Sequence, residues 1–393
     1  MVKEEYCDED GDSDTNNVEL KPRDGEVMLP HHDMMIPHWQ KFAKRLAGRT
    51  KVEEVKIYSV SLPRPVLDII LPTLQTLNLV GLTLFSTGLG NEGFQRLSSF
   101  VKGSTSLKDL ALGVNIVDNM SVADSISNAV HNHPSLEQIV FFKCGLNNTE
   151  ILGKILDGCD KLKSLTVSLE NLGLGGITAI SDFIISNHPT LEVLKLQHNN
   201  ISDSDSLLLA TALNNNTNIK QLNLRHNDIT EEGEKTLLKA VFDPTSMDSL
   251  VDSNHTCMTY TYDVSNASVL SQRPAVEREL MFTNGNENFS VGQKIRKKVV
   301  LALCGVDGSL FDLSHFNGLS LPLMPRVLEL IQEHSLTRRL ACSIMSAGQL
   351  EKDALSRLFH TLRGWELPLL FENLSPKKGT AGKRKRRKTR RCR

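Results

Sequence analysis

One pattern of apolar residues recurs along the middle of the chain and limits what the chain can fold into. Each copy places apolar side chains at positions 0, +3 and +5, a small residue or Asn at +8, and another apolar residue at +10. Eight copies begin at residues 52, 74, 107, 136, 162, 191, 219 and 247. Self-similarity at this period predicts a solenoid of stacked units, because one unit alone cannot bury its apolar face.

Each copy predicts a short strand followed by a helix. The clearest copies are Leu191-Leu194-Leu196-Asn199-Ile201 and Ile219-Leu222-Leu224-Asn227-Ile229. The 0, +3 and +5 side chains of the strand point into the solenoid, and the Asn amide satisfies backbone groups where the chain leaves the strand. The second half of a unit carries apolar residues at helical spacing, as in 93–101, 122–130 and 206–213. The copy at 162 has Glu170 in place of Asn, and the copy at 247 is the weakest.

These units resemble leucine-rich repeats, and their length and helices resemble the ribonuclease-inhibitor type over residues 52 to 251. The resemblance implies an α/β horseshoe with a parallel concave sheet and convex helices. The ribonuclease inhibitors themselves are rich in cysteine, whereas the well-formed units here hold only Cys144 and Cys159. The Pro-His-Trp run at 37–39, Ser-Asn-His-Thr-Cys at 253–257 and Arg-Gly-Trp-Glu-Leu-Pro at 363–368 resemble a group of uncharacterised protist leucine-rich-repeat proteins, which implies no chemistry.

The segments outside the repeats differ in charge and periodicity. Residues 1–34 hold 11 acidic and 3 basic side chains, and residues 376–393 hold 11 basic and no acidic ones, so the net charge of −1 conceals two opposite tails. The predicted organisation is an acidic disordered tail at 1–34, a helical cap at 35–51, the solenoid with its C-terminal cap and linker at 52–273, a small all-helical domain at 274–375 and a basic disordered tail at 376–393.

The concave face is the predicted binding surface. Strand alternation directs the +2, +4 and +6 residues of each unit onto it, and aromatic and arginine side chains there are typical of protein-binding surfaces. The predicted contact residues are Tyr58, Val80, Val140, Phe142, Lys195, Gln197 and Arg225. We therefore expect a non-catalytic scaffold that binds a protein partner. Some of these side chains could instead be ordinary surface residues or be covered by the chain itself.

The sequence contains no motif that supports an enzyme, and we expect no catalytic residue, cofactor or metal site. Residues 88–93 match the GxGxxG pattern of dinucleotide-binding loops, but similar glycine turns recur at the same place in other units and serve the loop that enters the helix. His133 and His188 precede strands two apart, about 10 Å from each other, which is too far for one metal ion. Turn residues before proline explain them better.

The basic tail predicts nuclear import, contact with nucleic acid, or a solvated segment with no partner. Its residues are Lys383, Arg384, Lys385, Arg386, Arg387, Lys388, Arg390 and Arg391. Such a segment resembles a nuclear localisation signal bound by an import receptor, and it could also bind RNA or DNA by releasing counterions. Seven cysteines without a CxxC pair and apolar runs too short for a bilayer favour a nuclear or cytoplasmic protein with no membrane contact.

An alternative function is regulation of a small GTPase. The Ran GTPase-activating proteins resemble this repeat subtype, but they carry an acidic segment after the repeats where this chain ends in basic residues.

Overall fold

A computed structural model describes residues 2–5, 16–22, 30–49, 51–263, 266–273 and 275–304. The chain divides into two units, residues 1–298 and residues 299–393. The description below concerns the first unit. The later helical patterns of the predicted 274–375 domain, Trp365 and the basic tail lie outside the described residues.

Within the described part of the first unit, ten strands form one open sheet in sequence order. Strands β2 to β10 are parallel, and β1 alone is antiparallel, pairing with β2. The strands are β1 (Val2–Glu5), β2 (Asn17–Pro22), β3 (Glu54–Tyr58), β4 (Gly81–Phe85), β5 (Asp109–Gly113), β6 (Gln138–Phe142), β7 (Ser164–Ser168), β8 (Val193–Lys195), β9 (Gln221–Asn223) and β10 (Met258–Tyr260).

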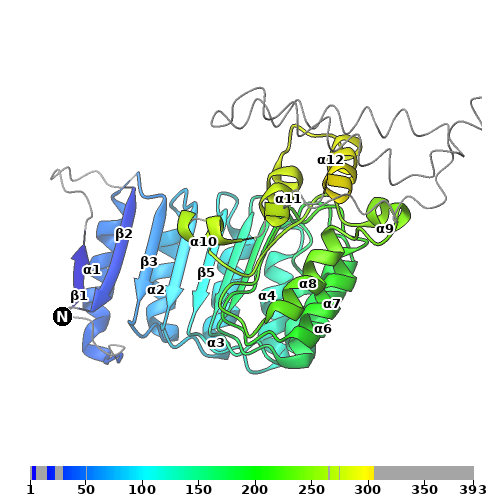
Figure 1. Ribbon diagram of the computed structural model, residues 1–393. Helices are drawn as coiled ribbons and strands as arrows, with labels where there is room; N and C mark the ends of the chain where they lie inside the picture. The colour runs from blue at the N-terminus through cyan, green and yellow to red at the C-terminus, as the bar shows by residue number, and fades with distance from the viewer. Residues whose placement is uncertain are drawn as a thin grey trace, which may run out of the picture. The chain divides into compact units, whose positions relative to one another are not determined.

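Helices connect successive parallel strands and pack beside one another on one side of the sheet (Figure 1). They are α1 (Ile36–Ala47), α2 (Arg64–Gln75), α3 (Asn91–Gly103), α4 (Met120–Val130), α5 (Thr149–Asp157), α6 (Gly173–Ile185), α7 (Asp203–Leu213) and α8 (Glu231–Val241). The short helices α9 (Met247–Asp252) and α10 (Ala267–Gln272) flank β10, and α11 (Ala275–Gly285) and α12 (Val291–Cys304) follow. Strands alternating with helices on one side make an α/β repeat solenoid, which confirms the predicted fold class.

The +3 leucines and isoleucines of the central units lie side by side across the sheet. Leu110 pairs with Ile139, Ile139 with Leu165, Leu165 with Leu194, and Leu194 with Leu222. All five are buried in one continuous core cluster. The predicted stacking register is therefore correct from β5 to β9.

The predicted register of the second leucine-rich repeat, which the sequence pattern places at residue 74, was wrong by five residues. Leu74 belongs to α2, and the strand β4 begins at Gly81, so the triplet that faces the core is Leu79-Leu82-Leu84. Val80 immediately precedes the strand, where its backbone bonds Glu53 and Lys108 on the two neighbouring units. The corrected start at residue 79 makes the first three starts 52, 79 and 107, which are more evenly spaced than 52, 74 and 107.

Both ends of the predicted solenoid also need correction. Residues 247–252 form the helix α9. The last strand is β10, in which Met258 pairs with Gln221 of β9, nine residues later than the predicted register placed it. At the other end β2 pairs with β3, and its Val18 and Leu20 are buried, so part of the 1–34 segment is an ordered strand rather than a disordered tail. Strand β2 and helix α1 therefore form an additional repeat before the predicted first one. Helix α1 packs against α2 in this repeat, rather than capping β3.

The predicted asparagine positions form a buried ladder behind the strands. Asn115 Oδ1 accepts hydrogen bonds from the backbone N–H groups of Thr87 and Leu89, 3.2 Å away in each case, and its Nδ2 donates to the carbonyls of Leu84 and Gly113. Asn227 makes the equivalent bonds two units after Glu170. The ladder satisfies backbone groups that the turn leaves without strand partners.

Glu170 performs half of this role in its own unit. Its carboxylate oxygens accept from the N–H groups of Cys144 and Leu146 at 2.6 and 2.8 Å. Burial raises the pKa of the Glu170 carboxyl, while these backbone hydrogen bonds act in the opposite direction. The substitution that weakened the sequence pattern at 162 thus keeps the acceptor function of asparagine.

A second ladder, not predicted from the sequence, lies just before the strands β6, β9 and β10. His133 Nδ1 accepts from the N–H groups of Ser135 and Leu136, and its Nε2 bonds the carbonyl of Val101 near the end of α3. Asn216 and Asn254 make the same pattern of bonds in later units. His133 is therefore a structural turn residue, in agreement with the interpretation favoured from the sequence.

Candidate functional site

The sheet face opposite the helices carries six of the seven predicted contact residues. Tyr58 ends β3, Val140 and Phe142 lie on β6, and Lys195, Gln197 and Arg225 lie on or just after β8 and β9. Val80 is the exception, because the register correction removes it from this face. Phe85 on β4 takes the place at the end of the strand, beside Tyr58 in the sheet.

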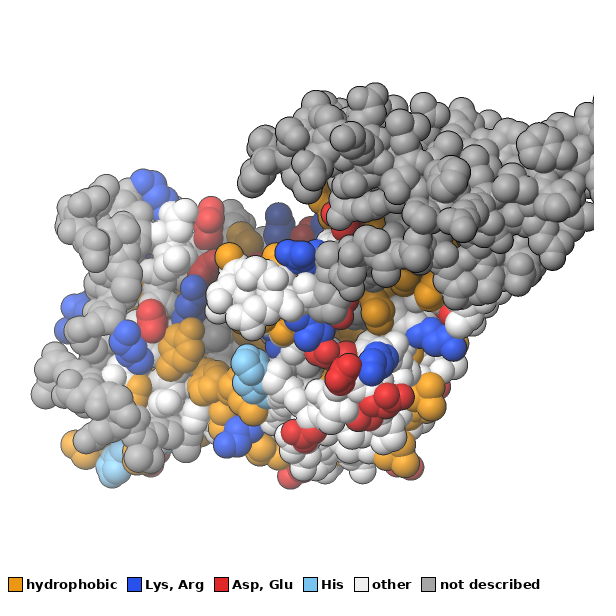
Figure 2. Space-filling model, in the orientation of Figure 1, with side chains coloured by type: hydrophobic (Ala, Val, Ile, Leu, Met, Phe, Trp, Pro, Cys, Tyr) orange, Lys and Arg blue, Asp and Glu red, His pale blue; other side chains and the backbone are white. Residues whose placement is uncertain are grey.

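Three aromatic rings form a continuous row, here called the aromatic ridge, defined as Tyr58, Phe85 and Phe142. The ring centroids of Tyr58 and Phe85 are 6.0 Å apart, and those of Phe85 and Phe142 are 5.5 Å apart, both with tilted planes. These separations lie in the favourable range for aromatic pairs. All three side chains are partly exposed, and Figure 2 shows hydrophobic side chains gathered over this part of the sheet.

Gly113 makes the ridge continuous across β5, the strand between β4 and β6. A Cβ atom at Gly113 would lie 2.1 Å from Cδ2 of Phe85, so the Phe85 ring occupies the space that any other side chain would fill. Phe85 therefore reaches over β5 to contact Phe142 on β6. A ring from one unit meets a ring two units away because the intervening unit has glycine.

Carboxylates lie at the opposite ends of the same strands. The side chain of Glu54 extends over Gly81, where a Cβ atom would lie 3.2 Å from Glu54 Cγ, and its Oε2 is 2.7 Å from Lys56 Nζ. Asp109 begins the next strand beyond Gly81. The pKa of the Asp109 carboxyl is raised, first by burial and then by the negative charges of Glu54 and Glu137.

Of the predicted cationic contact residues at the other end of the face, Arg225 is engaged in an ion pair within the chain. Arg225 Nη1 lies 2.9 Å from Asp263 Oδ1, in the segment that follows β10. The Arg225 side chain is 28% exposed, so this ion pair restrains a side chain that the sequence predicted to be free for a partner. The backbone carbonyl of Gln197 accepts a hydrogen bond from Ser168 Oγ at 2.8 Å, which joins β7 to the end of β8.

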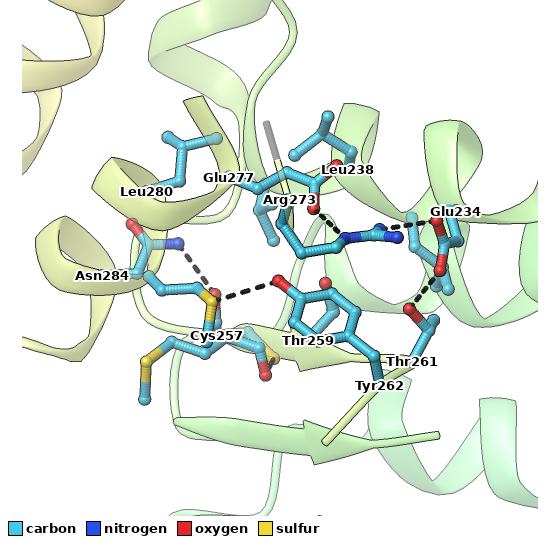
Figure 3. Close-up of a pocket in the computed structure, with 14 residues that line it drawn as sticks. Glu234, Leu238, Cys257, Thr259, Thr261, Tyr262, Arg273, Glu277, Leu280 and Asn284 are labelled. Atoms are coloured by element: carbon cyan, nitrogen blue, oxygen red, sulfur yellow. Dashed lines mark hydrogen bonds and ion pairs between the residues drawn. The ribbon is translucent and has the colours of Figure 1, made fainter. Parts of the chain in front are cut away.

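A small pocket lies between α8, β10 and α11 (Figure 3). Arg273 forms two ion pairs there: its Nη2 lies 2.6 Å from Glu234 Oε2, and its Nε lies 2.9 Å from Glu277 Oε2. Its guanidinium lies 4.2 Å from the centre of the Tyr262 ring. The cavity volume of about 40 Å³ suits a few water molecules rather than an organic ligand. We interpret this cluster as a clamp that closes the end of the solenoid.

Three cysteines of the solenoid and the glycine-rich loop have structural surroundings. Cys144, Cys159 and Cys257 are buried, and burial raises the pKa of each thiol to about 12. In the GxGxxG segment Gly88 has a φ of 64°, and Gly93 lies on the buried side of α3 against Leu89. The loop turns the chain from strand to helix, as the recurrence in other units indicated.

The fold and its internal ladders define the first compact unit, residues 1–298, as a repeat solenoid with leucine-rich-repeat-like architecture. No family model and no curated protein matches the sequence. Among solved structures the chain is similar to a protein of Bacteroides fragilis, with 16% sequence identity over 55% of this chain and 71% of that one and a TM-score of 0.34. Similarity at this level carries no inference about function.

Two further sequence predictions concern segments beyond the structure described. The basic residues 383–391 lie outside it, so nuclear import and contact with nucleic acid remain predictions, as does the GTPase-regulator alternative. Within the described ranges, no helix is both long and apolar enough to cross a membrane.

Proposed function

We propose that this protein is a leucine-rich-repeat scaffold of the ribonuclease-inhibitor-like type, which binds a protein partner on the concave face without catalysing a reaction. Its units support the subtype, because the units that start at residues 52 to 219 are 26 to 29 residues apart and each contains a full convex helix. Stacked units of this kind present an extended concave surface that is suited to binding another protein.

The aromatic ridge is the observation that carries the proposal. Three partly exposed rings from β3, β4 and β6 are ordered against one another on an open sheet face. Rigid aromatic side chains lose little conformational entropy on binding and are enriched among residues that dominate interface energetics. The ridge therefore takes the place of the broader set of contact residues predicted from the sequence as the centre of the binding surface.

Affinity capture from a native lysate tests the proposal, with the full-length chain as bait and quantitative mass spectrometry as readout. Substituting Phe142→Ala should remove an interface anchor worth about 2 kcal/mol, which is about a 30-fold loss of affinity. Leu207→Ala is the matched control, because Leu207 is an exposed apolar residue of α7 on the convex side, 59% exposed.

Both variants should unfold at the same temperature as the wild type within a few degrees, because both side chains are partly or largely exposed. Partners lost with Phe142→Ala and retained with Leu207→Ala would support the concave face. Partners lost only with Leu207→Ala would assign binding to the convex helices and reject the proposal.

A further inference from the structure

The concave face of β3 to β6 has two chemically different ends. The aromatic ridge lies at the carboxyl ends of the strands, and Glu54 and Asp109 lie at the amino ends of β3 and β5. The two rows are four residues apart along a strand, or about 13 Å at about 3.3 Å per residue. Between the two rows the face carries Lys56 on β3, which is paired with Glu54, and the uncharged side chains of Thr83 on β4, Ala111 on β5 and Val140 on β6.

Negative charge accumulates at the amino ends without full compensation. Glu54 is paired with Lys56, and Glu137 is paired with Lys163 at 3.0 Å. Among the residues that the structure describes, no ion pair engages Asp109. The charges of Glu54 and Glu137 raise the pKa of its carboxyl, and the charge of Lys108 opposes them with a smaller effect. A cation placed beside Asp109 would relieve this repulsion, whereas an acidic ligand would increase it.

The ridge adds a second preference for positive charge. Ring faces of tyrosine and phenylalanine attract ammonium and guanidinium groups, and they also pack well against aliphatic side chains. Glu19 on β2, whose carboxylate lies 3.5 Å from Lys21 Nζ, raises the pKa of the Tyr58 hydroxyl after the larger effect of burial, whereas the charges of Lys56 and Lys21 lower it. An arginine or lysine side chain would therefore find aromatic rings at the carboxyl ends of the strands and carboxylates at their amino ends.

We propose that the surface formed by Glu54, Asp109 and the aromatic ridge docks a basic segment of a partner protein. One arginine or lysine binds beside Asp109, and a second basic or aliphatic side chain, about four residues away in extended conformation, packs on the ridge. This inference rests on the proposed function, because it assigns the chemistry of the partner to the concave face. Charge complementarity sets the binding orientation and the salt dependence, and the rings provide most of the contact area.

The test uses a phage-displayed library of random 12-residue peptides selected on the full-length protein. Selected sequences are then synthesised, and their affinities are measured by fluorescence anisotropy against the wild type and variants. We expect the selected peptides to be enriched in arginine and lysine. Asp109→Asn should weaken them about threefold to fivefold at low salt, the range of a partly exposed ion pair. The effect should shrink as salt rises to about 0.5 M.

Asp182→Asn is the matched control, because Asp182 is exposed on the convex helix α6. It should leave peptide affinity unchanged. Phe85→Ala should weaken every selected peptide, whatever its charge, because it removes the central ring of the ridge. Thermal unfolding of each variant verifies that the fold is intact.

The outcomes separate this inference from the proposed function. Acidic or uncharged peptides that need Phe85 but are indifferent to Asp109→Asn would overturn the basic-segment inference and leave concave-face binding in place. Peptides that bind Phe85→Ala and Phe142→Ala as well as the wild type would overturn both. A synthetic peptide with the sequence of residues 376–393 serves as competitor. If it displaces the selected peptides at a lower concentration than any of them requires, and if this displacement depends on Asp109, the occupant is the chain's own terminus. That result also overturns the inference.

Discussion

Lys298 is the most unusual charged residue in the described structure. It projects from α12 into the end of the solenoid, where it is fully buried. Its Nζ donates hydrogen bonds to the carbonyl of Val241, the last residue of α8, at 2.5 Å, and to that of Asn254 at 2.7 Å. Burial, with a smaller contribution from the nearby charge of Lys294, lowers the pKa of the Lys298 amine from 10.5 to about 7. A neutral amine has two N–H groups, which match the two carbonyl acceptors.

This burial makes stability depend on pH in a definite direction. Between about pH 7 and 10.5 the unfolded chain holds a proton on Lys298 that the folded chain has lost, so the free energy of unfolding rises with pH in this window. The full difference corresponds to about 5 kcal/mol at about 1.4 kcal/mol per pKa unit. Between pH 6 and pH 9 the contribution of Lys298 should increase by about 2.5 kcal/mol.

Urea denaturation at half-unit steps from pH 6 to pH 9 tests the reasoning in the wild type and in Lys298→Met. The variant should lose the rise assigned to Lys298, while keeping the shallower rise from His255, whose pKa is lowered to about 4 mainly by burial. At pH 9 it should be less stable than the wild type by about 1 to 3 kcal/mol, because two carbonyls lose their donor. Lys102→Met, at an exposed position of α3, is the control and should follow the wild type. Parallel pH profiles for wild type and Lys298→Met would refute the argument.

Two other substitutions test the architecture of the ridge and of the ladder. Gly113→Ala should displace the Phe85 ring and destabilise the protein by about 1 to 3 kcal/mol, measured by chemical denaturation. Gly153→Ala in α5 is the control: its added methyl meets nothing within 4 Å, so it should stabilise the protein by up to about 1 kcal/mol. Equal effects would contradict the close packing inferred at Gly113. Asn115→Ala should cost about 3 kcal/mol or more, since it leaves several buried backbone groups without partners, while exposed Asn78→Ala should change stability by less than about 0.5 kcal/mol. A small loss at Asn115 would show that water replaces the ladder bonds.

The second repeat shows why the local apolar pattern alone misplaced a strand. Two overlapping triplets fit the 0, +3, +5 spacing, Leu74-Leu77-Leu79 and Leu79-Leu82-Leu84. The structure selects the later one, because α2 extends to Gln75 and the strand must stand in register with β3 and β5. The evenness of the unit spacing was the signal in the sequence that favoured this choice. Without it, Phe85 was missed as a binding residue.

The two ends of the sheet were misplaced for a different reason. β2 lies in an acidic segment, and β10 follows the weakest copy of the pattern, so neither stands out by composition. Each becomes a strand because a neighbouring strand offers it a row of unpaired backbone groups. Pairing of this kind depends on what lies beside the segment in space rather than on the segment itself.

The sequence by itself determined the stacking of the central units, because an apolar period of this length has no other way to bury its side chains. It also determined the concave positions of Tyr58, Val140 and Phe142 through the alternation of a strand. Only the tertiary structure decided that Phe85 crosses Gly113 to join those rings, that Asp263 engages Arg225, and that Lys298 enters the core. These contacts join residues far apart along the chain, and their energies depend on exact separation and burial, which no local pattern encodes.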